Sequence, residues 1–174
     1  MKYLSIALSG PVAAGTTTTA KALAEKLNLD YHSAGDFFRT YMKNHNIPLP
    51  NKEEIPDDIE KKVDSELTAA LASQKPVVVD GLYAAYFARD MDHVLKVLLT
   101  ADEETRIKRA YDRSPSHKES AKDVKKRDAA HDAKFRKLYA DENFLDPMYF
   151  DLIIDTTNTP QNEVESKITE KFKS

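Results

Sequence analysis

The chain alternates short apolar runs rich in β-forming residues with segments of helical spacing, and this alternation constrains the fold more than any other feature. The expected strands lie at 3–9, 29–35, 76–80, 93–100 and 150–156. The helical segments lie at about 15–27, 36–44 and 58–73, from about 103 onward, and at 163–172. The charged region 114–138 is also expected to be helical after the SPS break at 114–116. Repeated strand–helix order implies parallel strands joined by crossover helices. We therefore expect an α/β fold of three layers, with a five-stranded parallel sheet and helices on both faces.

Length and composition limit the classes of protein to consider. The 174 residues suffice for one domain, 1–174, with a buried core. Hydrophobic residues make up 41%, charged residues 32%, and the formal net charge is −3, which gives no general attraction to nucleic acid or anionic membranes. The absence of cysteine excludes disulfides and thiolate metal sites. No apolar run approaches 18 residues and none resembles a signal peptide, so we expect a cytoplasmic protein.

The segment GPVAAGTTTTA (10–20) directly follows the first apolar run and has the glycine spacing of a phosphate-binding loop. In the motif G-x-x-x-x-G-K-[ST], successive backbone N–H groups surround nucleotide phosphates at the N-terminus of a helix. Thr17 holds the position whose hydroxyl coordinates Mg²⁺. We therefore expect a P-loop fold with ATP as co-substrate and Mg²⁺ as cofactor. The expected ATP-binding residues are Gly10, Pro11, Val12, Ala13, Ala14, Gly15, Thr16, Thr17 and Thr18.

Thr16 stands where such loops carry a lysine. The chain thereby lacks a positive charge at the β- and γ-phosphates, which another cation must supply unless the chemistry is slow. Lys21 lies one turn further into the helix, and we expect it to be a surface residue. An ordinary strand–turn–helix junction with a Ser/Thr-rich cap would give a similar pattern, so the loop alone leaves that alternative open.

The segment SAGDFFR (33–39) resembles the one by which nucleoside monophosphate kinases hold their acceptor nucleotide. Together with residues 9–32, VVVDG (77–81), LTADEETRIKRAYDR (99–113) and YFDLIIDTTNTP (149–160), it is similar to the short, archaeal-type cytidylate kinases. The resemblance spans nearly the whole chain, and that family also includes loops of the GTTT kind. It implies transfer of the γ-phosphoryl group of ATP to a nucleoside monophosphate, with CMP or dCMP favoured. It also implies a monophosphate-binding subregion at about 33–75 and a helical lid at about 112–140.

The resemblance further implies roles for individual residues. Arg39 would grip the acceptor phosphate, since the guanidinium fork suits a phosphate bidentately. Asp80 ends a hydrophobic run, which is the position of the acid that orients Mg²⁺ through water in such kinases. The expected metal residues are therefore Thr17 and Asp80. The other expected acceptor-binding residues are Ser33, Gly35, Asp36, Gly81 and Arg89.

One position departs from the family pattern and bears on the base of the acceptor. After the third strand, cytidylate kinases of this type carry an arginine in a Gly-Arg pair that contacts the acceptor, but this chain has Leu82 there. Arg89, in the following helix, is the candidate to compensate. The identity of the acceptor base therefore stays open at this point.

The segment from Arg106 to Lys137 contains twelve Lys/Arg residues and five Asp/Glu residues, in a chain that is acidic overall. In the resembling family this segment is the lid over ATP, whose arginines neutralise charge on the transferred phosphoryl group. The expected catalytic residues are Thr16, Arg109, Arg113, Arg127 and Arg136. A solvated charged face would give the same composition. An RNA-binding face is disfavoured, because few aromatic residues accompany the charges.

Two further functions remain as alternatives. The protein could be a catalytically impaired nucleotide-binding module, which Thr16 and Leu82 favour because each removes a cation from a family position. It could also phosphorylate another small acceptor, such as AMP, UMP or a metabolite alcohol. Arg39 argues against the alcohol, because that arginine suits an acceptor that already carries a phosphate. The expected partners are ATP and a nucleoside monophosphate, with no nucleic acid and no membrane, and we expect a monomer.

Overall fold

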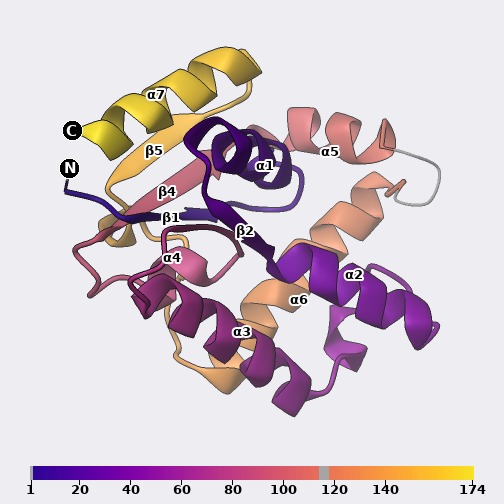
Figure 1. The fold of residues 1–174 in the computed structure, drawn as a ribbon. Coiled ribbons are helices and arrows are strands. Elements are labelled where there is room, and N and C mark those ends of the chain that lie inside the picture. Colours follow the sequence, from indigo (N-terminus) through magenta and orange to yellow (C-terminus); the bar gives the residue numbers. More distant parts are fainter. Residues whose placement is uncertain (1, 114–117) are drawn as a thin grey trace.

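A single parallel sheet forms the centre of the computed structural model, which describes residues 2–113 and 118–174 (Figure 1). Its strands are β1 (Ser5–Ser9), β2 (Asp30–Ser33), β3 (Val77–Asp80), β4 (Val94–Thr100) and β5 (Leu152–Asp155). Their spatial order is β2-β3-β1-β4-β5, and every neighbouring pair is parallel. The predicted five-stranded α/β fold is therefore confirmed.

Helices follow the strands as the alternation predicts. They are α1 (Thr16–Leu27), α2 (Ala34–Asn44), α3 (Asp57–Ala72), α4 (Ala84–Phe87), α5 (Glu103–Tyr111), α6 (Ala121–Leu138) and α7 (Gln161–Lys173), with 3₁₀ turns η1 (Lys52–Glu54) and η3 (Pro147–Tyr149). The short helix α4 and both 3₁₀ turns were not predicted. Within the described residues, no helix is long and apolar enough to cross a bilayer.

One predicted strand boundary is wrong, and side-chain caps set the starts of two helices. The strand predicted over 29–35 ends at Ser33, because the Ser33 side chain accepts a hydrogen bond from the Asp36 amide and starts α2 at Ala34. The helix predicted after the SPS break at 114–116 begins at Ala121, where Ser120 and Asp123 form a reciprocal capping box, and it ends at Leu138 as predicted. The SPS break itself lies outside the described residues.

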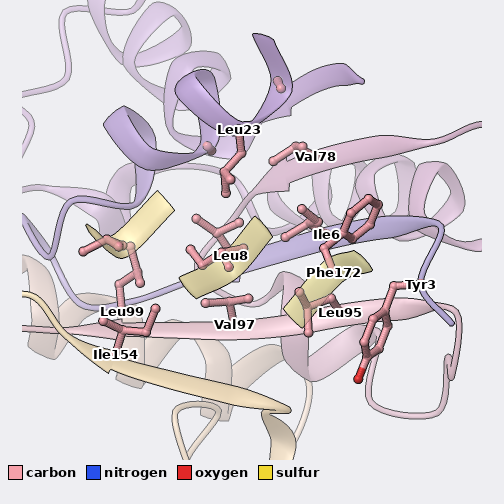
Figure 2. Close-up of a cluster of buried hydrophobic side chains, with 14 of the residues drawn as sticks. Tyr3, Ile6, Leu8, Leu23, Val78, Leu95, Val97, Leu99, Ile154 and Phe172 are labelled. Carbon is pink, nitrogen blue, oxygen red and sulfur yellow. The ribbon is translucent and has the colours of Figure 1, made fainter. Parts of the chain in front are cut away.

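The alternating side chains of the central strand β1 face two different hydrophobic cores. Ile6 and Leu8 pack with residues of α1 and α7, such as Leu23 and Phe172, on one face of the sheet. Figure 2 shows this cluster, with Leu23 and Phe172 near the strand residues. Ala7 faces the opposite side, where α3 and α4 pack. Burial on both faces explains why the three inner strands β1, β3 and β4 are rich in apolar residues, whereas the edge strand β2 is mostly polar.

The parallel arrangement brings three predicted site segments to one edge of the sheet. Strands β2, β3 and β1 are neighbours, and their carboxyl ends carry Ser33, Asp80 and Gly10 respectively. Helix α6 extends past this edge and is fixed at its C-terminal half, where Phe135 packs against Tyr83, Tyr86 and Phe144. Ligands bind at the carboxyl edge of open α/β sheets, so the site is to be sought there.

Candidate active site

The loop between β1 and α1 has the conformation of a phosphate cradle. A Cβ atom at Gly10 would collide with the carbonyl oxygen of Leu99, so the loop leaves the sheet in close contact with β4. Gly15 has φ = 99°, which strongly favours glycine, and Ala13 also has positive φ at 64°. Gly15 caps α1 without any side-chain hydrogen bond among the described residues. The first amide groups of α1 are thus available to an anion.

Neighbouring elements hold this loop in place. The amide of Val12 donates to Asp128 Oδ1 of α6 at 3.1 Å. Arg106 of α5 donates to the carbonyl oxygen of Val12 at 2.9 Å and to Asp128 Oδ2 at 2.8 Å. The hydroxyl of Thr156, after β5, donates to the carbonyl oxygen of Ala14 at 2.9 Å. Such fixation from several sides preorganises the backbone donors for a ligand.

Most of the predicted ATP-binding residues line the open space around the loop. Ala14 is the exception, because it is buried and its amide donates to the carbonyl oxygen of Pro11. The others line one or both of two adjoining hollows: Gly10, Pro11, Val12, Ala13, Gly15, Thr16, Thr17 and Thr18.

Asp80 lies at the centre of the carboxyl edge, and its side chain receives hydrogen bonds from several neighbours. Thr17 Oγ1 donates to Asp80 Oδ2 at 2.6 Å, while the hydroxyls of Ser33 and Tyr31 lie 3.4 and 3.5 Å from the same oxygen. Burial raises the pKa of the Asp80 carboxyl, and hydrogen bonds from Thr17 and Thr16 oppose this shift. The structure therefore brings the two predicted metal residues, Thr17 and Asp80, into direct contact.

A cleft of about 900 Å³, its open mouth included, extends from the loop between α2, α3 and α6. Arg39 lines both this cleft and the hollow beside the loop. Its guanidinium donates to Asp36 Oδ1 at 2.6 Å and packs close to Gly35. Three of the predicted acceptor residues of SAGDFFR, Gly35, Asp36 and Arg39, thus lie where the two spaces adjoin.

Two arginines of the basic segment also reach the cleft. Arg113 and Arg127 both line it, and Arg113 lines the adjoining hollow as well. Both donate to the same carboxylate oxygen of the buried Glu119, at 3.2 and 2.7 Å. Because Glu119 holds the two guanidinium groups together, the cleft has a fixed cluster of positive charge next to the phosphate loop.

The end of the cleft away from the loop has a polar floor that was not predicted from the sequence. Lys52, Glu60, Asp64 and His131 line it, and the Tyr139 hydroxyl donates to Asp64 Oδ2 at 2.7 Å. Burial raises the pKa of Asp64 to about 7, and the charge of Glu60 adds to the shift. Burial also lowers the pKa of His131 well below its ordinary value, so the imidazole is neutral.

The structure does not bring three of the predicted arginines to either hollow. Arg109 donates to the hydroxyl and carbonyl oxygens of Thr156, bracing the loop after β5. The guanidinium of Arg136 pairs with Asp132 and Asp141 on the outer side of α6. Arg89 donates to the Tyr86 carbonyl oxygen and is partly exposed.

The remaining predictions near the site have mixed outcomes. Lys21 is exposed, as expected, yet it lies 3.6 Å from Asp36 and lines the hollow beside the loop. Gly81 lines the cleft, but Ser33 instead caps α2 and contacts Asp80. Leu82 lines the cleft and packs against the aromatic cluster under α6. The position of the missing arginine is therefore an apolar part of the wall.

One signal in the sequence could have indicated part of the floor. Glu60 and Asp64 are four residues apart, and they share the buried face of α3 with Val63 and Leu71. Carboxylates on the apolar stripe of an amphipathic helix are rarely buried unless they have a partner or a ligand. Lys52 and His131 gave no comparable signal, because they belong to charged segments that looked solvated.

Comparison with known proteins places these features in a family. Residues 32–158 match the cytidylate kinase-like family. A cytidylate kinase of Sulfolobus acidocaldarius is 31% identical over 158 residues, covering 88% of this chain and 86% of that protein. A cytidylate kinase of Sulfurisphaera tokodaii is 30% identical over 172 residues, covering 96% and 93%.

Solved structures with lower identity share the fold. A gluconokinase of Sinorhizobium meliloti superposes with a TM-score of 0.66 at 17% identity, covering 99% of this chain and 94% of that one. A shikimate kinase of Acinetobacter baumannii superposes with a TM-score of 0.62 at 20% identity, covering 97% and 92%. The match over most of the chain is decisive for the family: the chain belongs to the cytidylate kinase-like family, and with it to the ATP-dependent nucleoside monophosphate kinases.

Proposed function

We propose that this protein transfers the γ-phosphoryl group of ATP to CMP or dCMP, giving the nucleoside diphosphate and ADP. The observation that carries the proposal is one continuous cleft, which runs from the phosphate loop past three arginines to a buried polar floor. Arginine forks suit the phosphate of an acceptor, and a polar floor suits the edge of a base. The names of the similar archaeal proteins favour cytosine as that base.

Each part of the cleft has a role in the proposed reaction. The loop amides and the N-terminus of α1 bind the β- and γ-phosphates of ATP, while Arg39 holds the acceptor phosphate. An oxygen of that phosphate attacks the γ-phosphorus, and the bond to the β–γ bridging oxygen breaks, releasing ADP. Arg113 and Arg127, held together by Glu119, stabilise the charge on the phosphoryl group in transit. They also supply the positive charge that Thr16 lacks.

The oxygen atoms at the carboxyl edge fit Mg²⁺, a hard cation that prefers oxygen ligands. Thr17 Oγ1 and Asp80 Oδ2 lie 2.6 Å apart beside the loop, so Thr17 would bind the ion directly and Asp80 through water. Within the described ranges, no group of three or more His, Asp or Glu side chains is arranged to hold a metal. Such a sparse set suits Mg²⁺, which usually keeps several waters and binds substrate phosphates. When bound, the ion would neutralise negative charge on the β- and γ-phosphates.

A coupled ADP-release assay tests the acceptor assignment. The protein is assayed with ATP, Mg²⁺ and each of CMP, dCMP, UMP and AMP, with a reaction lacking acceptor as the control for ATP hydrolysis. We expect the highest kcat/KM with CMP or dCMP and loss of turnover when a chelator removes Mg²⁺. Absence of turnover with all four monophosphates would refute the assignment.

Thr16 and Leu82 favour a second candidate function, a nucleotide-binding protein that has lost catalysis. Thr16 supplies no cation to the loop, and Leu82 presents an apolar side chain to the cleft. Calorimetry combined with the ADP assay separates the two functions. A non-catalytic binder takes up ATP or a monophosphate with measurable heat but yields no ADP above the control.

A further inference from the structure

The floor of the cleft contains buried polar atoms whose hydrogen bonds are incomplete. Glu60 is fully buried, with 0% exposure, and neither of its carboxylate oxygens receives a hydrogen bond within the described part of the chain. The buried Nδ1 atom of His131 also has no partner there. Both residues line the cleft. An unsatisfied buried polar group is costly, so its presence at a cavity points to a ligand that completes the hydrogen bonding.

The ammonium group of Lys52 lies beside the Glu60 carboxylate, but it does not use all of the hydrogen-bond acceptor capacity of Glu60. Lys52 Nζ is 2.7 Å from Glu60 Oε1, although this oxygen has no hydrogen bond of acceptable geometry. The ammonium group also lies 3.6 Å from the centre of the Phe38 ring. Lys52 thus stabilises a carboxylate at a site where an isolated charge would be very costly. An ionised carboxylate can only accept hydrogen bonds.

The surroundings of these groups suit a planar base. Phe38, Met42 and Leu49 provide apolar walls of the same cleft, and the arginine cluster lies toward the phosphate loop. An acceptor nucleotide whose phosphate contacts Arg39 would therefore direct its base toward the floor. His131 is four residues after Arg127 on α6, so one face of this helix supplies groups to both ends of the cleft.

This inference rests on the proposed function. We propose that Glu60 determines the choice of base by accepting a hydrogen bond from the exocyclic amino group of cytosine, with His131 beside it at the same edge of the base. Uracil has a carbonyl oxygen in place of that amino group. It would leave Glu60 without a donor and bring two negative oxygens together, so the contact selects against uracil as well as for cytosine. Because adenine also carries an amino group next to a ring nitrogen, the contact separates cytosine from uracil rather than pyrimidines from purines.

The test compares kcat/KM for CMP and UMP in the intact protein, in Glu60→Gln and in Glu66→Gln. Glu66 is an exposed carboxylate on the same helix, so its variant makes the same chemical change away from the cleft. Glutamine both donates and accepts, so it tolerates either base. We expect the intact protein to prefer CMP by about 100-fold or more, and Glu60→Gln to lower that ratio at least about tenfold. Glu66→Gln should leave the ratio unchanged.

Two further measurements keep the test decisive. Because Glu60→Gln leaves Lys52 buried without its carboxylate, the double variant Lys52→Met/Glu60→Gln, which removes both charges, is measured beside it. The intact protein is also assayed with the pyrimidin-2-one ribonucleotide, which lacks only the amino group of CMP, and should use it at least about tenfold less efficiently than CMP.

The outcomes separate this inference from the proposed function. If a folded Glu60 variant keeps the CMP/UMP ratio of the intact protein, or if the intact protein uses the amino-free analogue as well as CMP, the assignment of Glu60 is overturned while the kinase activity stands. If the intact protein phosphorylates no monophosphate, the proposed function fails first.

Discussion

Replacing Arg39 by alanine should abolish most of the efficiency with the monophosphate while leaving the fold intact. The Arg39 side chain is 25% exposed and lies where the cleft meets the hollow beside the phosphate loop. Its only ion pair among the described residues is with Asp36, which is itself 44% exposed. Surface pairs of this kind contribute at most about 1 kcal/mol, so the melting temperature should fall by only a few degrees.

The catalytic effect should be much larger than the effect on stability. A charge-assisted, bidentate contact with a phosphate is worth about 2–4 kcal/mol, which corresponds to a loss of roughly 30- to 1,000-fold in kcat/KM. Asp36 fixes the orientation of the guanidinium, and Arg39→Lys keeps the charge without the fork. We therefore expect Arg39→Lys to recover only part of the loss.

The assay measures kcat/KM for CMP at saturating ATP, the affinity for ATP, and the melting temperature of each variant. Lys43→Ala is the matched control, since it removes a positive charge from an exposed position on the same helix. It should leave kcat/KM unchanged. If Arg39→Ala stays folded and keeps near-normal kcat/KM, Arg39 does not bind the acceptor phosphate, and the case for a monophosphate acceptor loses its main support from the side chains.

Three further changes test other parts of the structure. Arg136→Ala should leave steady-state activity nearly unchanged, because its guanidinium lies outside the cleft; a large fall in kcat would show that this arginine enters the site during turnover. Lys134→Met should lower the free energy of unfolding by about 1–3 kcal/mol in urea titrations, because the buried ammonium donates to the Ile55 carbonyl oxygen and to Asp57. The folded-state pKa of Asp64 is raised from 3.8 to about 7, so this group makes the free energy of unfolding fall as pH rises from about 4 to about 7, by at most about 4 kcal/mol. Asp64→Asn should remove that dependence, and equal pH profiles of unfolding for the two proteins would contradict the raised pKa.

The parts of the site that local sequence determines were predictable. Gly10 and Gly15 are required by a close backbone approach and by a positive φ, and both requirements can be read from the spacing of a strand–loop–helix unit. Asp80 follows an apolar run, and the rule that parallel strands share a carboxyl edge places it near Thr17. In these cases the position of the functional group depends only on one strand, the loop after it, and the neighbouring strand in the sheet.

The basic segment was predicted less well, because its composition does not say which face of the helix meets the cleft. Val124, Arg127, His131 and Lys134 follow the spacing of one helical face, and that face packs toward the body. Arg136 lies off this face and pairs with exposed acids. A count of arginines over 112–140 treats these positions alike, whereas the helical period separates them.

The polar floor shows where inference from sequence needs both burial and topology. Helical period places Glu60 on the stripe of α3 that also carries Val63 and Leu71, so the sequence alone puts a carboxylate where water is excluded. Such a residue is stable only with a partner, and the local pattern does not reveal that partner. Lys52 belongs to a 3₁₀ turn before α3, and His131 belongs to α6, 71 residues after Glu60. Only the fold brings the three together around one cavity. Apart from its ion pair with Lys52, Glu60 has unused acceptor capacity after the fold has closed around it, so it indicates a ligand contact more specifically than the basic composition of residues 106–137 does.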